Sequence, residues 1–175
     1  MVRVKQWTQD EQLSYLLFDP ISRRSALIDA CPQYQEMYQE TLQMRGLHNI
    51  YLLYTFTPEY DVDIPGTVIF PSMDLPDSVL PLGETHIERF CNNSSTLSAY
   101  LCEGHLFSGY WWVPFSLRQI SAGEPAEKSV MLPLINLSDD YILHPGRMVS
   151  GIRISTIGQE KSFAEAESAD GVHHG

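Results

Sequence analysis

The residues of this chain whose chemistry suits metal binding lie far apart in the sequence: His48, His86, His105, His144, Asp61 and Asp63. Imidazole and carboxylate groups are the usual protein ligands of a catalytic zinc or iron ion. No two of the histidines are two or four positions apart, the spacing that places a ligand pair on one face of a strand or helix. The spacing therefore favours ordinary surface or core histidines over a metal site built from them.

The three cysteines are Cys31, Cys91 and Cys102. Their odd number and uneven spacing argue against a disulfide scaffold and fit a reducing compartment. Cys91 is the candidate nucleophile, because polar asparagines follow it, but an inert small hydrophobe is the commoner role of such a residue.

The composition excludes several classes of partner. The 175 residues suit one domain, and the net charge of −11 disfavours binding to nucleic acid or anionic membranes. No apolar run reaches the ~20 residues of a membrane helix, so we expect no membrane insertion. The N-terminus has no apolar stretch suited to a secretory signal, which makes the cytoplasm the expected location.

The first half of the chain predicts strand, strand, helix, strand. The segments 12–18 and 25–29 are short and apolar, and the turn residues between them predict a hairpin. A helix is expected over 32–45, with Pro32 in its first turn and Gly46 just beyond its end. The nearly continuous apolar run 49–57 predicts a strand that is covered on both faces.

The second half predicts short strands separated by loops. Within 61–83, which is rich in Pro, Asp and Gly, only 67–70 resembles a strand, and 121–128 reads as a polar loop or short helix. Further strands are expected at 86–90, 97–102 and 141–144, and the segment 106–109 leads into an aromatic patch. The pattern indicates an α/β or α+β layered domain over residues 1–161, followed by a flexible acidic tail at 162–175. Any metal bound by His173 and His174 in this tail is expected to be adventitious.

Five segments, in order, resemble the metallo-β-lactamase superfamily, and its glyoxalase II and persulfide dioxygenase branch in particular. The opening hairpin, Ser14–Asp19 and Ala26–Asp29, resembles "tYLi.d…a.lID", and Ile50–Thr55 resembles the approach to the first metal motif. The remaining three are Leu106–Gly109 ("lFtGD"), His144–Arg147 ("yPGHG") and Ser155–Lys161 ("tTIGeE"). The resemblance implies a shortened αββα sandwich of two mixed sheets with outer helices and a metal cleft along one edge.

The metal-ligand positions of that family hold other residues here. They are Phe56, Pro58, Glu59 and Tyr60 for the first motif, Asn93 for the histidine of "PGHT", Tyr110 for the aspartate of "GD", and Arg147 for the histidine of "PGHG". No histidine remains at these positions, and Glu59 is the only carboxylate. Phenylalanine and proline donate nothing to a metal, and arginine repels a cation. The resemblance therefore predicts a degenerate metallohydrolase-like pseudoenzyme with no catalytic residues, no metal and no cofactor.

The vacated positions suggest how the cleft is filled. We expect Arg147 to replace the positive charge of the metal and to pair with Glu59 or Asp61. The dense aromatic segment at the cleft mouth is either core or a partner-binding surface, and its residues are Tyr110, Trp111, Trp112 and Phe115. The expected function is a structural or protein-interaction module that docks a protein partner or self-associates.

Two alternatives stay open. One is a metal-dependent hydrolase or sulfur-processing oxygenase with atypical ligands drawn from His86, His105, His144, Asp61 and Asp63. The other is a small-anion binder that uses the vacated cleft, with Arg147 holding the anion.

Overall fold

The computed structural model describes residues 1–55, 62–64, 67–70, 79–91, 98–109, 137–146, 148, 151 and 153–162. They form two mixed β-sheets. The first has the order β1-β2-β3-β4-β5 and consists of Arg3–Gln9, Gln12–Phe18, Arg24–Ile28, His48–Leu53 and Val68–Phe70. Strands β1 to β3 are antiparallel to one another, whereas β3, β4 and β5 run parallel.

The second sheet has the order β11-β10-β9-β8-β7-β6. In chain order its strands are Val79–Leu82 (β6), Thr85–Cys91 (β7), Ser98–Cys102 (β8), His105–Gly109 (β9), Ile142–Pro145 (β10) and Ser155–Thr156 (β11). All neighbouring pairs are antiparallel except β9 and β10, which are parallel. Helical residues 157–162 follow β11.

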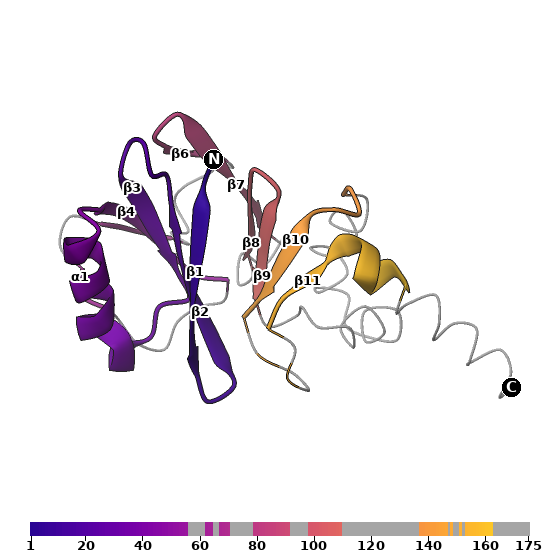
Figure 1. Ribbon diagram of the computed structural model, residues 1–175, viewed down its shortest axis with the longest axis horizontal. Helices are drawn as coiled ribbons and strands as arrows, with labels where there is room; N and C mark the ends of the chain where they lie inside the picture. Colours follow the sequence, from indigo (N-terminus) through magenta and orange to yellow (C-terminus); the bar gives the residue numbers. More distant parts are fainter. Residues whose placement is uncertain are drawn as a thin grey trace, which may run out of the picture.

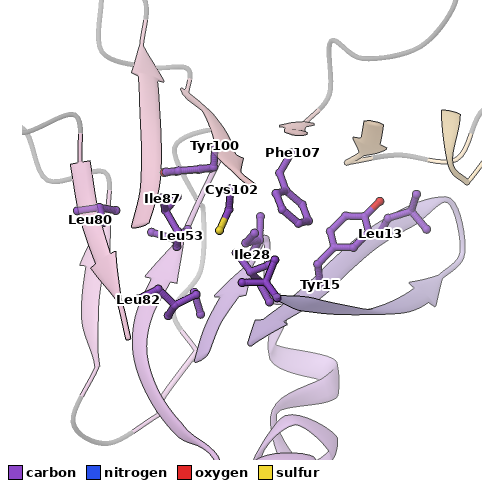
Figure 2. Packing of buried hydrophobic residues seen from close by; sticks show 13 residues of the cluster. Leu13, Tyr15, Ile28, Leu53, Leu80, Leu82, Ile87, Tyr100, Cys102 and Phe107 are labelled. Atoms are coloured by element: carbon purple, nitrogen blue, oxygen red, sulfur yellow. The ribbon is translucent and has the colours of Figure 1, made fainter. Parts of the chain in front are cut away.

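The main core lies between the two sheets (Figure 2). Its members alternate along each strand, as period-2 side-chain placement requires, and they come from both sheets. From the first sheet Leu13, Tyr15, Ile28 and Leu53 point inward, and from the second Leu80, Leu82, Ile87, Tyr100, Cys102 and Phe107 do so. This shared layer makes the molecule a β-sandwich.

A helix covers the outer face of the first sheet. The 3-10 turn η1 (Pro32–Tyr34) leads into α1 (Gln35–Met44), whose Tyr38 and Leu42 pack on Leu16, Leu27 and Leu52 of the sheet (Figure 1). Tyr38 also donates or accepts a 2.8 Å hydrogen bond with the Ser14 hydroxyl. The outer face of the second sheet carries its own smaller cluster, which includes Ala99, Leu106, Leu143 and Ile157.

The expected fold class is confirmed, and so are the hairpin, the helix and the strand core of the first half. The sequence analysis missed four of the described strands, β1, β6, β9 and β11. Strand β1 was overlooked because five of its seven residues are charged or polar, and β6 because Pro81 lies inside it. Strand β4 ends at Leu53, four residues before the predicted end. The segment 121–128 and residues 163–175 lie outside the described part of the chain.

Within the described residues, no helix combines the length and the apolar composition that a membrane span requires.

Candidate functional site at the strand-end edge

The site positions suggested by the sequence all follow or precede strands that meet at one edge of the sandwich. Strands β9 and β10 are parallel, and Gly109 at the end of β9 is in register with Pro145 at the end of β10. Strand β8 is antiparallel to β9, so its first residue, Ser98, lies at the same edge. The register of β7 with β8 pairs Cys91 with Ser98 there as well.

The first sheet joins this edge through the residues that follow β4. The backbone N–H of Ser98 donates to the Thr55 carbonyl at 3.0 Å. The hydroxyl of Tyr100 donates to the Tyr54 carbonyl at 2.8 Å. These two bonds connect the end of β4 to the start of β8 and join the two sheets at the edge.

The seven vacated ligand positions themselves lie outside the described residues: Phe56, Pro58, Glu59, Tyr60, Asn93, Tyr110 and Arg147. The same holds for Asp61 and for the aromatic residues Trp111, Trp112 and Phe115. What the structure describes are their flanking residues, which are Thr55, Cys91, Ser98, Gly109 and Gly146. These described residues lie along the strand-end edge.

Asp29 fixes the end of β4. One carboxylate oxygen accepts the backbone N–H of Thr55 at 2.8 Å, and the other accepts the Thr55 hydroxyl at 2.8 Å. Asp29 itself has a positive φ of 53°, a conformation that Asp and Asn tolerate better than most residues. Burial raises the pKa of this carboxyl to about 6, against the lowering effect of the two bonds from Thr55. The clamp positions the residue directly before Phe56.

Arg89 places a positive charge at the same edge. It lies on β7 in register with Tyr100, whose ring is in the inter-sheet core, and it is 6% exposed. Its Nε donates to the Ser98 hydroxyl oxygen at 3.2 Å. Burial raises the pKa of Tyr100, and the charge of Arg89 on the neighbouring strand acts in the opposite direction.

The chain after β10 is tied to the β1–β2 hairpin. The backbone N–H of Leu13 donates to the Gly146 carbonyl at 3.0 Å, and that of Met148 donates to the Glu11 carbonyl at 2.6 Å. The hydroxyl of Tyr15 donates to the Pro145 carbonyl. The two residues that flank Arg147 are therefore held against the hairpin tip.

Two histidines that are distant in sequence meet in the core. The Nδ1 of His105 and the Nε2 of His144 are 2.9 Å apart, and the rings stack with centroids separated by 5.2 Å. His144 is buried between Phe107, stacked at 4.6 Å, and the edge of Tyr15. Burial, with a smaller effect from His105, lowers the pKa of His144 to about 3, and burial also lowers that of His105. The pair is therefore neutral near pH 7.

The other residues considered as atypical ligands lie apart from this pair. His86 is exposed and contacts Glu88 at 3.4 Å. Asp63 is also exposed, and its backbone N–H donates to the Oε1 of Gln35, the first residue of α1. His48 is exposed at the start of β4. In the ranges that the structure describes, no three His, Cys, Asp or Glu side chains form a group able to hold a metal ion. The side chain of Cys91, and His173 and His174, lie outside those ranges.

The described residues at the edge do not by themselves supply a ligand set for a metal ion. A hydrolytic ion needs several imidazole or carboxylate ligands around it. The described edge instead presents Thr55, Ser98 and the fixed charge of Arg89, and both oxygens of Asp29 are used by Thr55. Arginine cannot lose its proton at physiological pH and repels a nearby cation.

Sequence reasoning missed Arg89 and Asp29 as members of the site. The signal for Arg89 was present, because strand alternation from Ile87 places residue 89 on the inner face, where a charged residue is unusual. The histidine pair had no such signal, since 39 positions separate its members.

Taken together, the two mixed sheets, the outer helix and the strand-end edge define the metallo-β-lactamase fold. Solved structures with this fold are similar over most of the chain. ETHE1 from Myxococcus xanthus superposes with a TM-score of 0.72 at 15% identity, covering 91% of this chain and 81% of that one. A metallo-β-lactamase from Staphylococcus aureus subsp. aureus COL gives 0.69 at 16% identity and covers 93% and 62%, respectively.

A third structure, the BLEG-1 B3 metallo-β-lactamase, gives a TM-score of 0.64 at 13% identity and covers 91% of this chain and 97% of that one. Comparison with protein-family models gives no match, and comparison with curated protein sequences gives none either. At these identities the likeness concerns the fold alone.

Proposed function

We propose that this chain is a non-catalytic protein of the metallo-β-lactamase fold that works without a metal ion. The observation that carries the proposal is the buried guanidinium of Arg89 at the strand-end edge, 3.2 Å from the Ser98 hydroxyl. A fixed positive charge at this edge opposes the binding of a cation there. The residue types at the seven vacated positions support the same conclusion, since only Glu59 among them is an ordinary metal ligand.

We expect the purified protein to contain far less than one zinc or iron ion per chain. The measurement is elemental analysis of the full chain carrying His173→Ala and His174→Ala, which removes the adventitious tail ligands. Added zinc is also expected to leave the melting temperature unchanged. A site on the folded protein would instead stabilise it by ~2.7 kcal/mol at a hundred times its Kd.

His86→Gln is the matched control for the tail substitutions His173→Ala and His174→Ala, because His86 is exposed and lies on β7. Near-stoichiometric metal that survives the tail substitutions would contradict the proposal. It would favour the alternative of a hydrolase or oxygenase with atypical ligands, for which His105→Phe and His144→Phe would be the next variants to lose the ion.

We further propose that the retained fold acts as a structural or protein-interaction module in the cytoplasm. Cys31 and Cys102 are buried and are not in a disulfide, which fits a reducing compartment. The candidate contact residues are Tyr110, Trp111, Trp112 and Phe115, because aromatic side chains anchor interfaces efficiently. The partner is either another protein or a second copy of the chain.

The native mass of the protein tests the module. We expect the chain isolated from cells under native conditions to have a mass above that of the 19.9 kDa monomer. Replacing Trp111 and Trp112 with serine should return it to the monomer mass, since truncating an interface anchor typically costs ~2 kcal/mol or more. A monomer in cells, or an assembly unaffected by both substitutions, would count against the module.

A further inference from the structure

We propose that the chain docks an acidic segment of a protein partner at its basic end, a surface formed by Arg3, Arg23, Arg24 and Arg45. The inference rests on the proposed interaction module and deepens it, because it names a surface and the chemistry of the partner. These residues are distinct from the aromatic residues considered as contacts.

Two of the arginines lie at the end of the first sheet opposite the strand-end edge. Arg23 and Arg24 close the turn between β2 and β3. The backbone N–H of His48, the first residue of β4, donates to the Arg23 carbonyl at 2.8 Å. Arg24 is in register with His48, and the parallel strands β3 and β4 run from here towards the edge.

Phe18, the last residue of β2, brings the other two arginines to the same end. The guanidinium carbon of Arg45, which follows α1, lies 5.5 Å from the centre of the Phe18 ring, a cation–π contact that positions the charge. Arg3 is directly opposite Phe18 in the register of β1 with β2, and residues opposite one another share a face of the sheet. Four of the 11 Lys and Arg residues therefore gather at this end of an acidic protein.

These four charges are open to a partner. All four side chains are exposed, and none forms an ion pair with a carboxylate in the part of the chain that the structure describes. Asp19, in the same turn, is buried and accepts the backbone N–H groups of Ile21 and Ser22. Glu84, exposed in the neighbouring turn between β6 and β7, pairs with none of the described arginines.

Arg23 is held in a conformation that arginine seldom adopts. Its φ of 61° lies in the left-handed region, which turns usually fill with Gly or Asn. Backbone strain of this kind is concentrated in functional segments. A Cβ at Gly46 would lie 3.0 Å from the Nη1 of Arg23, so the guanidinium is seated against the backbone of Gly46. An arginine where glycine would fit without strain favours a role for its charge.

Two exposed apolar side chains accompany the arginines. Ile21 is 80% exposed and Met44 is 85% exposed. Ile21 lies two positions before Arg23, and Met44 directly precedes Arg45. A surface that combines cationic and apolar side chains fits a protein segment that carries both carboxylates and apolar residues.

Charge complementarity selects a short acidic segment over an extended polyanion. The chain has a net charge of −11, so the surface beyond the basic end is strongly acidic. Electrostatic interactions between exposed charges act over about 8 Å at physiological ionic strength. A membrane or a nucleic acid extends beyond this distance and is repelled by the acidic surroundings, whereas a few carboxylates of a protein segment contact the arginines alone.

The test is fluorescence anisotropy with the full chain and a labelled synthetic peptide in which glutamates flank two leucines. We expect saturable binding with a Kd on the order of 10–100 μM at about 0.1 M salt, weakened several-fold at about 0.3 M salt. The same peptide with glutamine in place of each glutamate should not bind. Tighter binding of phosphatidylserine vesicles or of a single-stranded oligonucleotide than of the peptide would overturn the assignment to a protein segment.

Two double variants with the same change in net charge locate the peptide. Arg23→Gln with Arg45→Gln should weaken binding about tenfold. The matched control combines Arg153→Gln with Lys161→Gln, which flank β11, and should keep the affinity within about twofold of the wild type. Equal binding by the two double variants, or no binding of the peptide by the wild type, would overturn the basic end.

Arg23→Gly separates docking from stability. Glycine adopts the positive φ without strain, so the melting temperature should stay the same or rise. Peptide binding should nevertheless weaken about threefold, because one charge of the surface is lost. A lower melting temperature together with unchanged peptide binding would show that Arg23 is structural and would count against the proposal.

The protein with Trp111→Ser and Trp112→Ser distinguishes a failure of this inference from a failure of the proposed function. Unchanged peptide binding by this protein, together with weakened binding by Arg23→Gln with Arg45→Gln, supports the basic end. Loss of peptide binding in the tryptophan variant alone would place the acidic segment at the aromatic residues, which overturns the basic end and leaves the interaction module intact. The native mass in cells tests the module itself.

Discussion

Replacing Asp29 with alanine is expected to lower the free energy of unfolding by about 4 kcal/mol at pH 7. The substitution leaves the backbone N–H and the hydroxyl of Thr55 buried without their acceptor. Each such group costs about 1–3 kcal/mol. Alanine also tolerates the positive φ at position 29 less well than aspartate, which adds about 1 kcal/mol. Denaturant unfolding followed by circular dichroism measures the change.

Two further variants make the result specific. Asp29→Asn keeps an acceptor for the Thr55 N–H and tolerates the backbone conformation, so it should cost about half as much. Asp139→Ala removes an exposed carboxylate that pairs with Lys161 at 2.7 Å and should change stability by less than about 1 kcal/mol. If Asp29→Ala were as mild as Asp139→Ala, the clamp on the end of β4 would have no structural importance.

Acid is expected to destabilise the wild type through His144. The pKa of this histidine is about 3 in the folded protein and 6.5 for the free side chain, so the unfolded state binds the proton more readily. The stabilising contribution of neutral His144 is therefore fully present above pH 6.5 and is lost as the pH falls from 6.5 towards 3. Between pH 7 and pH 4 the loss from this residue is on the order of 3 kcal/mol. The variant His144→Phe keeps a ring against Phe107 and should lack this loss.

Asp29 acts in the opposite direction. Its pKa is raised from 3.8 to about 6, so the contribution to stability is fully present below pH 3.8 and is lost as the pH rises through 6. The wild type should therefore show a shallow net dependence between pH 7 and pH 4, because the two effects partly offset each other. Between pH 7 and pH 4, the free energy of unfolding of His144→Phe should rise, because only the Asp29 effect remains. That of Asp29→Asn should fall more steeply than that of the wild type, because only the His144 effect remains.

The comparison is made from unfolding free energies at each pH. His86→Gln is the matched control, because His86 is exposed and its replacement should leave the slope unchanged. Parallel curves for the wild type and His144→Phe would show that protonation of His144 does not limit stability in acid.

The fold was predictable where a single segment carries its own signal. The apolar strands 12–18 and 25–29 and the helix bounded by Pro32 and Gly46 required only local patterns. Strand β1 has no such local signal, because it is an edge strand, where polar residues are tolerated on both faces. Only Val4 and Trp7 of β1 pack against the cores, one on each side of the sheet.

The strand-end edge was predictable in part, whereas the site positions themselves stay a prediction. The segments Ala26–Asp29, Ile50–Thr55, Leu106–Gly109 and His144–Arg147 contain the ends of β3, β4, β9 and β10, which meet at this edge. The sequence reading attributed the positive charge at this edge to Arg147, which lies outside the described residues, and overlooked Arg89. The partners of a buried charge depend on contacts between neighbouring strands. Those contacts follow from the strand register, which local sequence patterns do not determine.

The pair formed by His105 and His144 illustrates the same limit. Parallel pairing of β9 with β10 places residues 105 and 144 on one face, although no spacing rule connects them. Within the described residues, no third potential metal ligand joins these two histidines. They bond to each other and are packed among aromatic rings.

The most direct test of metal independence is a crystal structure of protein produced in medium supplemented with zinc and iron, with anomalous diffraction recorded at both absorption edges. We expect no anomalous peak at the strand-end edge and the guanidinium of Arg89 within hydrogen-bond distance of Ser98. An anomalous peak there, bound by Glu59 together with histidine side chains, would contradict the account.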